Sequence, residues 1–170
     1  RLYKTVLDAA GDKPVVFRTL DVPLAIHVGM TRDEILAHLE SIRSRNVMAE
    51  LAFYAWRDLS RTEREPFIKA ALERNPVCIK GAEKLDEAAL VSLLGTWPNE
   101  SIYEVPSRFA QPDEVWNFRR GDGWEKALLV ADVLNSRVPG LAPVLAVEDG
   151  MAVLRQDSRV VCAFPTSKSV

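Results

Sequence analysis

Two cysteines and two histidines are the side chains in this sequence whose types suit nucleophilic catalysis. Cys78 and Cys162 are the only thiols, and His27 and His38 are the only imidazoles. The cysteines lie far apart and form no Cys-x-x-Cys motif, so they predict neither a disulfide framework nor a zinc site. Two histidines cannot build a His-rich metal site, and we expect no metal and no cofactor. The simplest interpretation is a pair of buried thiols in a reducing compartment.

The composition is typical of a globular domain that binds neither nucleic acid nor membranes. Of the 170 residues, 48% are hydrophobic and 27% are charged, and the net charge is −2. A nucleic-acid-binding surface usually needs a basic excess, and no apolar run approaches the ~18 residues of a membrane span. Residues 1–4 do not lead into the apolar segment of a signal peptide. With the unpaired cysteines, this favours a cytoplasmic location.

Residues 1–111 are predicted to form a mostly helical N-terminal region. Thr31 with Glu34 and Ser60 with Glu63 have the capping-box spacing that begins helices. We expect helices over residues 31–42, 47–56, 66–74 and 86–94, the last closed by Gly95, and a short helix followed by strands at 15–17 and 24–28 in the first 30 residues. Residues 77–79 predict a short strand or a buried connection, and 96–112 a loop with one strand near 102–105.

Residues 112–170 have a different pattern. Residues 124–134 predict an amphipathic helix whose apolar face carries Ala127, Leu128, Ala131 and Leu134. Three apolar runs follow, at 143–147, 151–154 and 160–164, with turns at 149–150 and 156–158 between them, as in an antiparallel meander. The predicted fold class is α+β, with the helical part packed on a helix plus an antiparallel meander in one compact unit.

The start of the predicted helix resembles the nucleophile region of the transglutaminase-like superfamily. Residues 119–124 read Arg-Arg-Gly-Asp-Gly-Trp, where the family has an Arg-Gly-Asp-Cys run that opens a helix. Free amides and the helix dipole at such a start lower the pKa of a thiol. The family's histidine follows a glycine and precedes an alanine, as Met151 does. Its aspartate precedes Pro-Thr, as Phe164 does.

The resemblance implies a transglutaminase-like core that has lost its catalytic triad. Gly123, Met151 and Phe164 stand in place of nucleophile, base and orienting acid, and none of them can do that chemistry. We expect no transglutaminase, protease or amidase turnover. Met151 and Phe164 should point into one space beside Gly123, so that restoring all three triad residues together would cost less than the single changes suggest. The residues expected to bind a peptide or protein at this groove are Trp116, Arg119, Arg120, Asp122 and Trp124.

Residues 1–21 resemble one strand of the phosphoenolpyruvate-binding barrel in Enzyme I of the sugar phosphotransferase system. The shared run is Arg-Thr-Leu-Asp at residues 18–21, and in that family its arginine, here Arg18, grips the substrate phosphate. The chain then departs from the family's Gly-Gly-Asp-Lys, and an eight-stranded barrel needs about 250 residues. The resemblance therefore implies a local fragment that cannot bind phosphoenolpyruvate unaided.

Three interpretations of function follow. The leading one is a non-catalytic transglutaminase-like domain that acts as a binding or scaffold module of a larger protein. The alternative is an enzyme, either a cysteine hydrolase that uses Cys162 or a fragment of a phosphoenolpyruvate-dependent phosphotransferase that uses Arg18. A third is a recombined chain without function. A thiol-directed electrophile separates the first two, because a binding module should react only slowly. The partner and the oligomeric state stay open.

Overall fold

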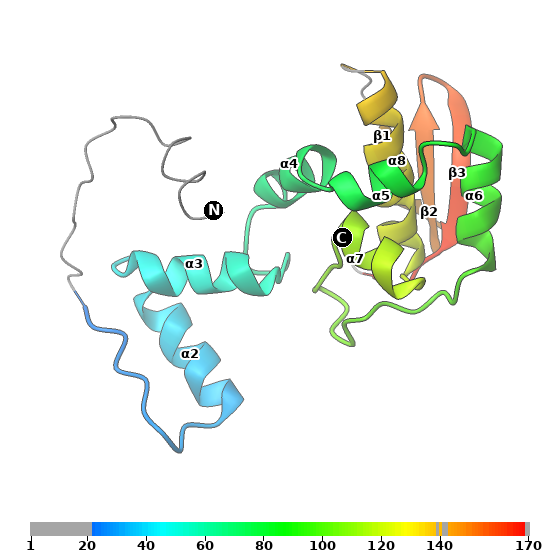
Figure 1. Cartoon of the computed structure of the whole chain (residues 1–170). Coiled ribbons are helices and arrows are strands. Elements are labelled where there is room, and N and C mark those ends of the chain that lie inside the picture. The colour runs from blue at the N-terminus through cyan, green and yellow to red at the C-terminus, as the bar shows by residue number, and fades with distance from the viewer. Residues whose placement is uncertain (1–21, 139, 141–142, 169–170) are drawn as a thin grey trace, which may run out of the picture. The chain divides into compact units, whose positions relative to one another are not determined.

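The computed structural model describes residues 22–138, 140 and 143–168 (Figure 1). The chain divides into two compact units, Arg1–Leu51 and Ala52–Val170. Residues 52–111 therefore belong to the same unit as residues 112–170. Arg18 and the elements predicted before residue 22 lie outside the described residues.

The described part of the first unit is helical. Helix α2 (Arg32–Ile42) begins at Thr31, whose hydroxyl accepts a hydrogen bond from the Glu34 amide at 3.3 Å. The Glu34 carboxylate accepts from the Thr31 amide at 2.7 Å, which confirms the predicted capping box. Helix α3 (Val47–Trp56) starts in this unit, where the Asn46 side chain accepts from two amides of its first turn. Asn46, which lies between the helices predicted over residues 31–42 and 47–56, is thus a helix cap.

The prediction of a strand at residues 24–28 is wrong, since the structure has no strand there. Side chains from α2 and from the residue before α3 bind the backbone of residues 22 and 24 instead. The Leu24 carbonyl makes a 2.5 Å hydrogen bond with His38 Nε2, and the Val22 carbonyl accepts from Asn46 Nδ2 at 2.7 Å. Because side chains supply hydrogen bonds to these backbone carbonyl groups, the segment needs no partner strand.

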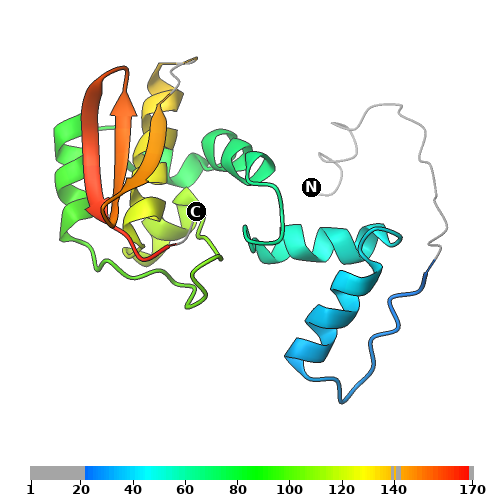
Figure 2. The same ribbon diagram turned by 180° about the vertical axis from the view of Figure 1, so that it is seen from behind.

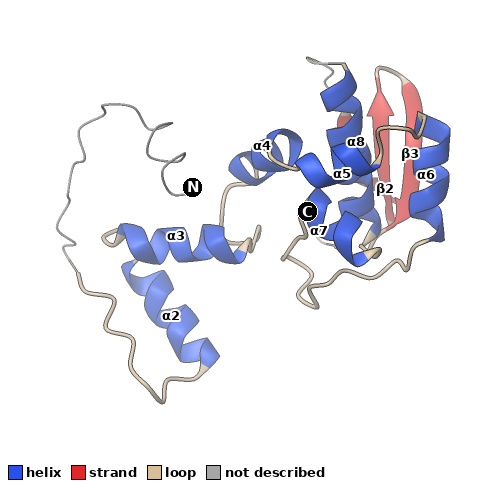
Figure 3. Ribbon diagram, viewed as in Figure 1, coloured by secondary structure: helices blue, strands red, loops and turns tan. Residues whose placement is uncertain are grey.

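The second unit contains helices and a three-stranded sheet, which confirms the α+β class (Figure 3). The helices are α4 (Glu65–Glu73), α5 (Pro76–Gly81), α6 (Glu87–Thr96), α7 (Pro112–Phe118) and α8 (Gly123–Arg137). The strands are β1 (Val144–Glu148), β2 (Met151–Gln156) and β3 (Arg159–Pro165). They pair antiparallel in the order β1-β2-β3, which is the predicted meander.

Four local predictions in this unit are wrong. Ser60 does not cap a helix, because its hydroxyl donates to Asp58 and α4 starts later, at Glu65. Residues 77–79 lie in helix α5 rather than in a strand. Gly95 lies inside α6, which ends at Thr96. Residues 102–105 form no strand.

Helix α8 is the centre of the second unit. It packs against β2 and β3 on one side and against α4, α7 and α6 on others. Every residue from 123 to 134 is buried, so the prediction of a helix with one apolar face is wrong. Figure 2 shows the opposite face of the sheet toward the viewer, and within the described part of the second unit no helix covers it. Burial on all sides means that the polar residues of α8 must find partners inside the protein.

Candidate functional site

The residues that resemble a nucleophile region form the start of α8. The Asp122 carboxylate caps the helix by accepting a hydrogen bond from the Trp124 amide at 2.9 Å, and Glu125 accepts from the Asp122 amide at 2.9 Å. This confirms the prediction that the Gly121–Gly123 turn opens a helix. Asp122 also accepts from the Thr166 hydroxyl and from the Ser167 amide at 2.8 Å. The amides of Asp122 and Trp124 are therefore occupied by side chains of the chain itself.

Gly123 leaves no room for a side chain at the first position of α8. A Cβ atom there would lie 2.1 Å from the Pro165 carbonyl oxygen and 2.7 Å from that of Phe164. Both contacts are to backbone, which cannot move aside as a flexible side chain would. Asn99 fixes the same segment by donating to the Pro165 carbonyl at 2.7 Å. The end of β3 thus fills the space that a nucleophile would need.

The strand register places the other two triad positions apart. Strand β2 pairs with β3 as predicted, but Phe164 lies opposite Ala152, whereas Met151 lies opposite Pro165. Directly paired residues point to the same face of a sheet and adjacent residues to opposite faces. Met151 and Phe164 therefore point to opposite faces, and the expectation that they share one space is wrong. Phe164 is buried on the α8 side, with its ring centre 5.8 Å from Lys126 Nζ.

Both thiols are buried and protonated at neutral pH. Cys162 faces the same side as Phe164, and burial raises its pKa to about 12. Cys78 lies in α5, where its Sγ lies 3.1 Å from Asp132 Oδ2 and 3.3 Å from the Asn75 carbonyl oxygen, both acceptors for its one thiol proton. Burial raises the pKa of the Cys78 thiol far above its usual range. Neither cysteine has the exposed, electropositive surroundings of a reactive thiolate.

Asp132 is a buried carboxylate with a perturbed pKa, as functional sites often have, and the sequence analysis did not single it out. Its side chain is fully buried in α8, and its Oδ1 has no hydrogen-bond partner among the described residues. Burial raises the pKa of Asp132 to about 6, and the nearby Asp113 carboxylate adds to the rise. The available signal was an acidic residue inside the otherwise apolar run of residues 127–134.

Lys168, near the C-terminus, is a buried lysine that lies close to Glu125 at the start of α8. Lys168 Nζ donates to the carbonyls of Tyr103, Val105 and Arg108 at 3.1, 3.1 and 2.5 Å. It lies 3.8 Å from Glu125 Oε1, which is itself fully buried. Burial raises the pKa of Glu125 and lowers that of Lys168. An ammonium that donates all three protons to carbonyls is a structural anchor, and it holds the loop before α7 against the C-terminal segment.

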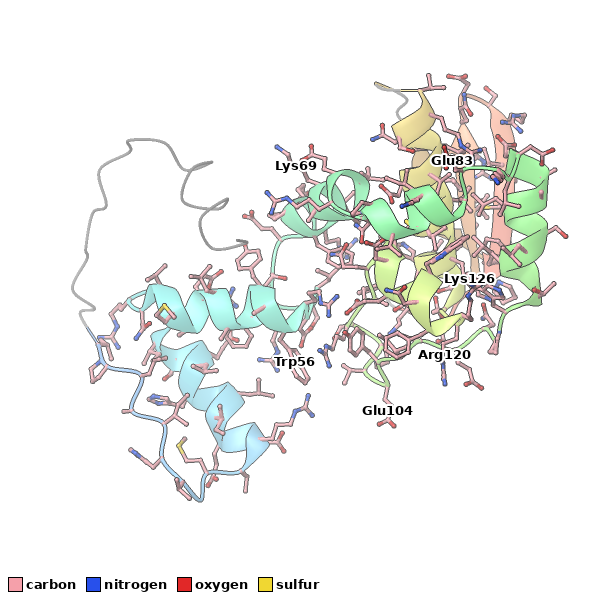
Figure 4. The ribbon with its side chains drawn as sticks, viewed as in Figure 1. Trp56, Lys69, Glu83, Glu104, Arg120 and Lys126 are labelled. Atoms are coloured by element: carbon pink, nitrogen blue, oxygen red, sulfur yellow. The ribbon has the colours of Figure 1, made fainter. Side chains whose placement is uncertain are left out.

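Glu125 accepts two further hydrogen bonds that connect it to the same loop. The Ser101 hydroxyl donates at 2.7 Å and the Ala110 amide at 2.8 Å. The adjacent Lys126 is also buried, and its Nζ donates to the Trp97 carbonyl at 2.8 Å. Figure 4 labels Lys126 among the side chains between α8 and α6. The buried polar groups at this end of α8 are thus hydrogen-bonded within the protein and stabilise the fold.

The predicted binding residues do not gather at one site. The Arg119 guanidinium lies over the rings of Trp97 and Trp116, at 5.3 and 5.4 Å from their centres. Arg120, labelled in Figure 4, forms an ion pair with Glu100 at 2.7 Å, so its charge is already neutralised. Trp124 instead packs edge-on against Phe109, with ring centres 4.7 Å apart.

Trp124 lines an apolar cavity of about 240 Å³ between α4, α8 and β1. The other residues of its wall are Arg64, Ile68, Leu72, Leu128, Ala131, Pro143 and Leu145. A second hollow of about 350 Å³ lies on the other side of α4 and includes Arg57. Arg57 is held there by Glu114 through two hydrogen bonds.

Comparison of the chain with models of protein families, with curated proteins and with solved structures found no match. Across residues 22–138, 140 and 143–168, no three His, Cys, Asp or Glu side chains are grouped so that they could hold a metal ion. In the same part of the chain, no helix has the length and apolar character needed to cross a membrane.

Proposed function

We propose that this chain is a non-catalytic binding module with the helix-plus-meander layout of a transglutaminase-like core. The observation that carries the proposal is the contact between Gly123 and the end of β3. A nucleophile in this layout requires a side chain at the first position of α8. The backbone of Phe164 and Pro165 occupies that place, at distances from an added Cβ that no real structure tolerates.

The chemistry of the thiols supports the same proposal. A cysteine nucleophile acts as its thiolate, which low pKa and access to substrate favour. Cys162 is buried on a strand, and its pKa is raised to about 12. His27 and His38 belong to the first unit, so they give Cys162 no general base within its own unit. The hydrolase alternative therefore has no support in the geometry of the second unit.

The proposed partner is a peptide or protein. The uncovered face of the sheet exposes Val144 and Val160, and a cavity with apolar walls lies beside Trp124. Exposed apolar groups next to a rigid, tightly bonded framework are typical of interaction surfaces. The buried network of Glu125 and Lys168 supplies that rigidity.

Turnover measurements test the proposal. The purified chain is incubated with a glutamine-containing peptide plus a primary amine, with a casein substrate and with a p-nitrophenyl ester. The parent, Cys162→Ala and the control Cys78→Ala should give the same background rates. Hydrolysis or amine incorporation that disappears in Cys162→Ala, while thermal unfolding stays normal, would show that the chain is an enzyme.

A further inference from the structure

The cavity between α4, α8 and β1 combines apolar walls with one cationic residue. Seven of the eight residues that line it are apolar, counting Trp124, and the eighth is Arg64. We propose that this cavity binds an apolar group that carries a carboxylate, such as the C-terminal apolar residue of a peptide. This inference rests on the proposed binding function and names the class of ligand.

The size of the cavity limits the ligand to a small group. Sites for drug-sized ligands and cofactors have volumes of roughly 300–1,000 Å³. A cavity of about 240 Å³ is smaller, so it suits one aliphatic or aromatic side chain, or a short acyl chain. Its walls from α8, at Leu128 and Ala131, have no polar side-chain atoms that would require water. A ligand without an apolar end would therefore gain little there.

Arg64 supplies the charge complementarity. It is exposed on the turn before α4, and its side chain makes no hydrogen bond or ion pair with any described residue. The contrast is Arg57, which lines the neighbouring hollow but is held by the Glu114 carboxylate. A free guanidinium presents a planar fork of donors that fits a carboxylate through two parallel hydrogen bonds. An anionic end group on the ligand would complete this arrangement.

The cavity is formed before a ligand arrives. Trp124 is held by the edge-on contact with Phe109 and by the Asp122 cap on its own amide. Leu145 lies on β1 and is paired with Leu154 of β2. Walls that need no rearrangement reduce the conformational cost of binding, so a small ligand can bind measurably.

Nuclear magnetic resonance titration of the full chain tests the inference with defined probes. The probes are N-acetyl-glycyl-leucine, the same compound as its C-terminal amide, and octanoate as a free acid. Both carboxylates should shift the Trp124 indole N–H signal and the methyl signals of Ile68, Leu72 and Leu145. The amide should bind about five- to tenfold more weakly, since it cannot pair with Arg64. If the peptide acid binds and octanoate does not, the site takes peptide C-termini only.

The variant Arg64→Gln tests how much the Arg64 charge contributes to carboxylate binding, and Arg74→Gln is the matched control. Arg74 is exposed at the other end of α4 and does not line the cavity. Arg64→Gln should weaken both carboxylates about five- to tenfold and leave the amide unchanged, whereas Arg74→Gln should change nothing. Equal binding of acid and amide, an Arg64→Gln variant that binds like the parent, or no shifts up to about 10 mM of either acid would overturn the inference. Shifts confined to another surface would also overturn it but would leave the proposed binding function standing, whereas consumption of the peptide would refute that function.

Discussion

At the scale of single residues, Asp132 makes the stability of this fold depend on pH. Its carboxyl is fully buried, receives a hydrogen bond from the Cys78 thiol and has one oxygen without a described partner. Burial raises its pKa from 3.8 to about 6. The folded state then holds the proton more tightly than the unfolded state does. The contribution of Asp132 to the free energy of unfolding is therefore greatest below pH 4 and is lost as the pH rises toward 6.

Asp132→Asn should remove this dependence. Above pH 6, the free energy of unfolding of the variant should exceed that of the parent by about 1–2 kcal/mol, because the parent must keep a buried charge. The gain is limited because the new amide also lacks a partner. Below pH 4 the advantage should disappear. Urea denaturation of both proteins between pH 3.5 and about 7.5 measures the difference, and a difference that is constant across that range would contradict the interpretation of Asp132.

The residue scale is also where sequence reasoning was weakest. Asp122 was predicted to bind a partner, whereas the structure uses its carboxylate as the N-cap of α8. The burial of Glu125, Lys126 and Asp132 was not predicted, because helical periodicity identifies one apolar face and cannot show that all sides are covered. Their partners come from segments distant in sequence, including the Lys168 end of the chain.

At the scale of elements, the start of α8 is packed directly on the end of β3. Gly123→Ala should lower the free energy of unfolding by about 2–3 kcal/mol, because the new Cβ meets backbone rather than a movable side chain. Gly95→Ala in α6 is the matched control. A Cβ there meets nothing within 4 Å, so the better helix propensity of alanine should add up to about 1 kcal/mol. Equal stability of Gly123→Ala and the parent would mean that this contact is looser than described.

The same contact changes what restoring the triad should do. Gly123→Cys places a larger group against the Pro165 carbonyl, and Met151 and Phe164 point to opposite faces of the sheet. The triple change Gly123→Cys, Met151→His, Phe164→Asp should therefore show no mutual rescue. Its cost in thermal denaturation should be at least the sum of the single costs, in contrast to the expectation from the resemblance alone.

The C-terminal segment is held to the loop before α7 by one ammonium group. Lys168→Met removes the donor to three carbonyls and leaves Glu125 buried without a counter-charge, so it should cost about 3–5 kcal/mol. Adding Glu125→Gln should recover part of that loss. A double-mutant cycle in urea measures the recovery, and strictly additive costs would show that the two charges act independently.

Periodicity and turn chemistry predicted the long elements well. The helix at α8 and the three strands of the meander lie within a few residues of their predicted positions. Helices α5 and α7 were missed because they have only 6 and 7 residues, too few for a helical period to show. The start of α5 depends on the distant Asp113 carboxylate, which accepts from the amides of Val77 and Cys78. Such support is tertiary, so no local pattern indicates it.

At the scale of the whole molecule, the chain consists of two compact units, and the second contains the sheet and the buried network. Removal of residues 1–45 should leave the second unit folded, since the Asn46 cap of α3 is retained and Arg57 still pairs with Glu114. The thermal midpoint of the shortened chain should fall by less than about 4 °C. Loss of a cooperative transition would show that the second unit depends on the first.

The α+β fold class could be predicted from the sequence, whereas the candidate site could be predicted only in part. Turns and apolar alternation in residues 143–164 were enough to predict the antiparallel meander. The convergence of Met151 and Phe164 was inferred from resemblance and not from register, and a shift of one residue reverses the face of a side chain. The cavity beside Trp124 arises from three elements that no local pattern brings together.

The reactivity of the two thiols tests the central claim most directly. The folded chain is treated with iodoacetamide at pH 7.5, and the modification of Cys78 and Cys162 is followed by mass spectrometry, with the urea-unfolded chain as the reference. A non-catalytic module with buried, protonated thiols should react at least about 100-fold more slowly when folded than when unfolded. Modification of Cys162 in the folded chain as fast as in the unfolded one would reveal an accessible, activated thiolate and contradict the claim.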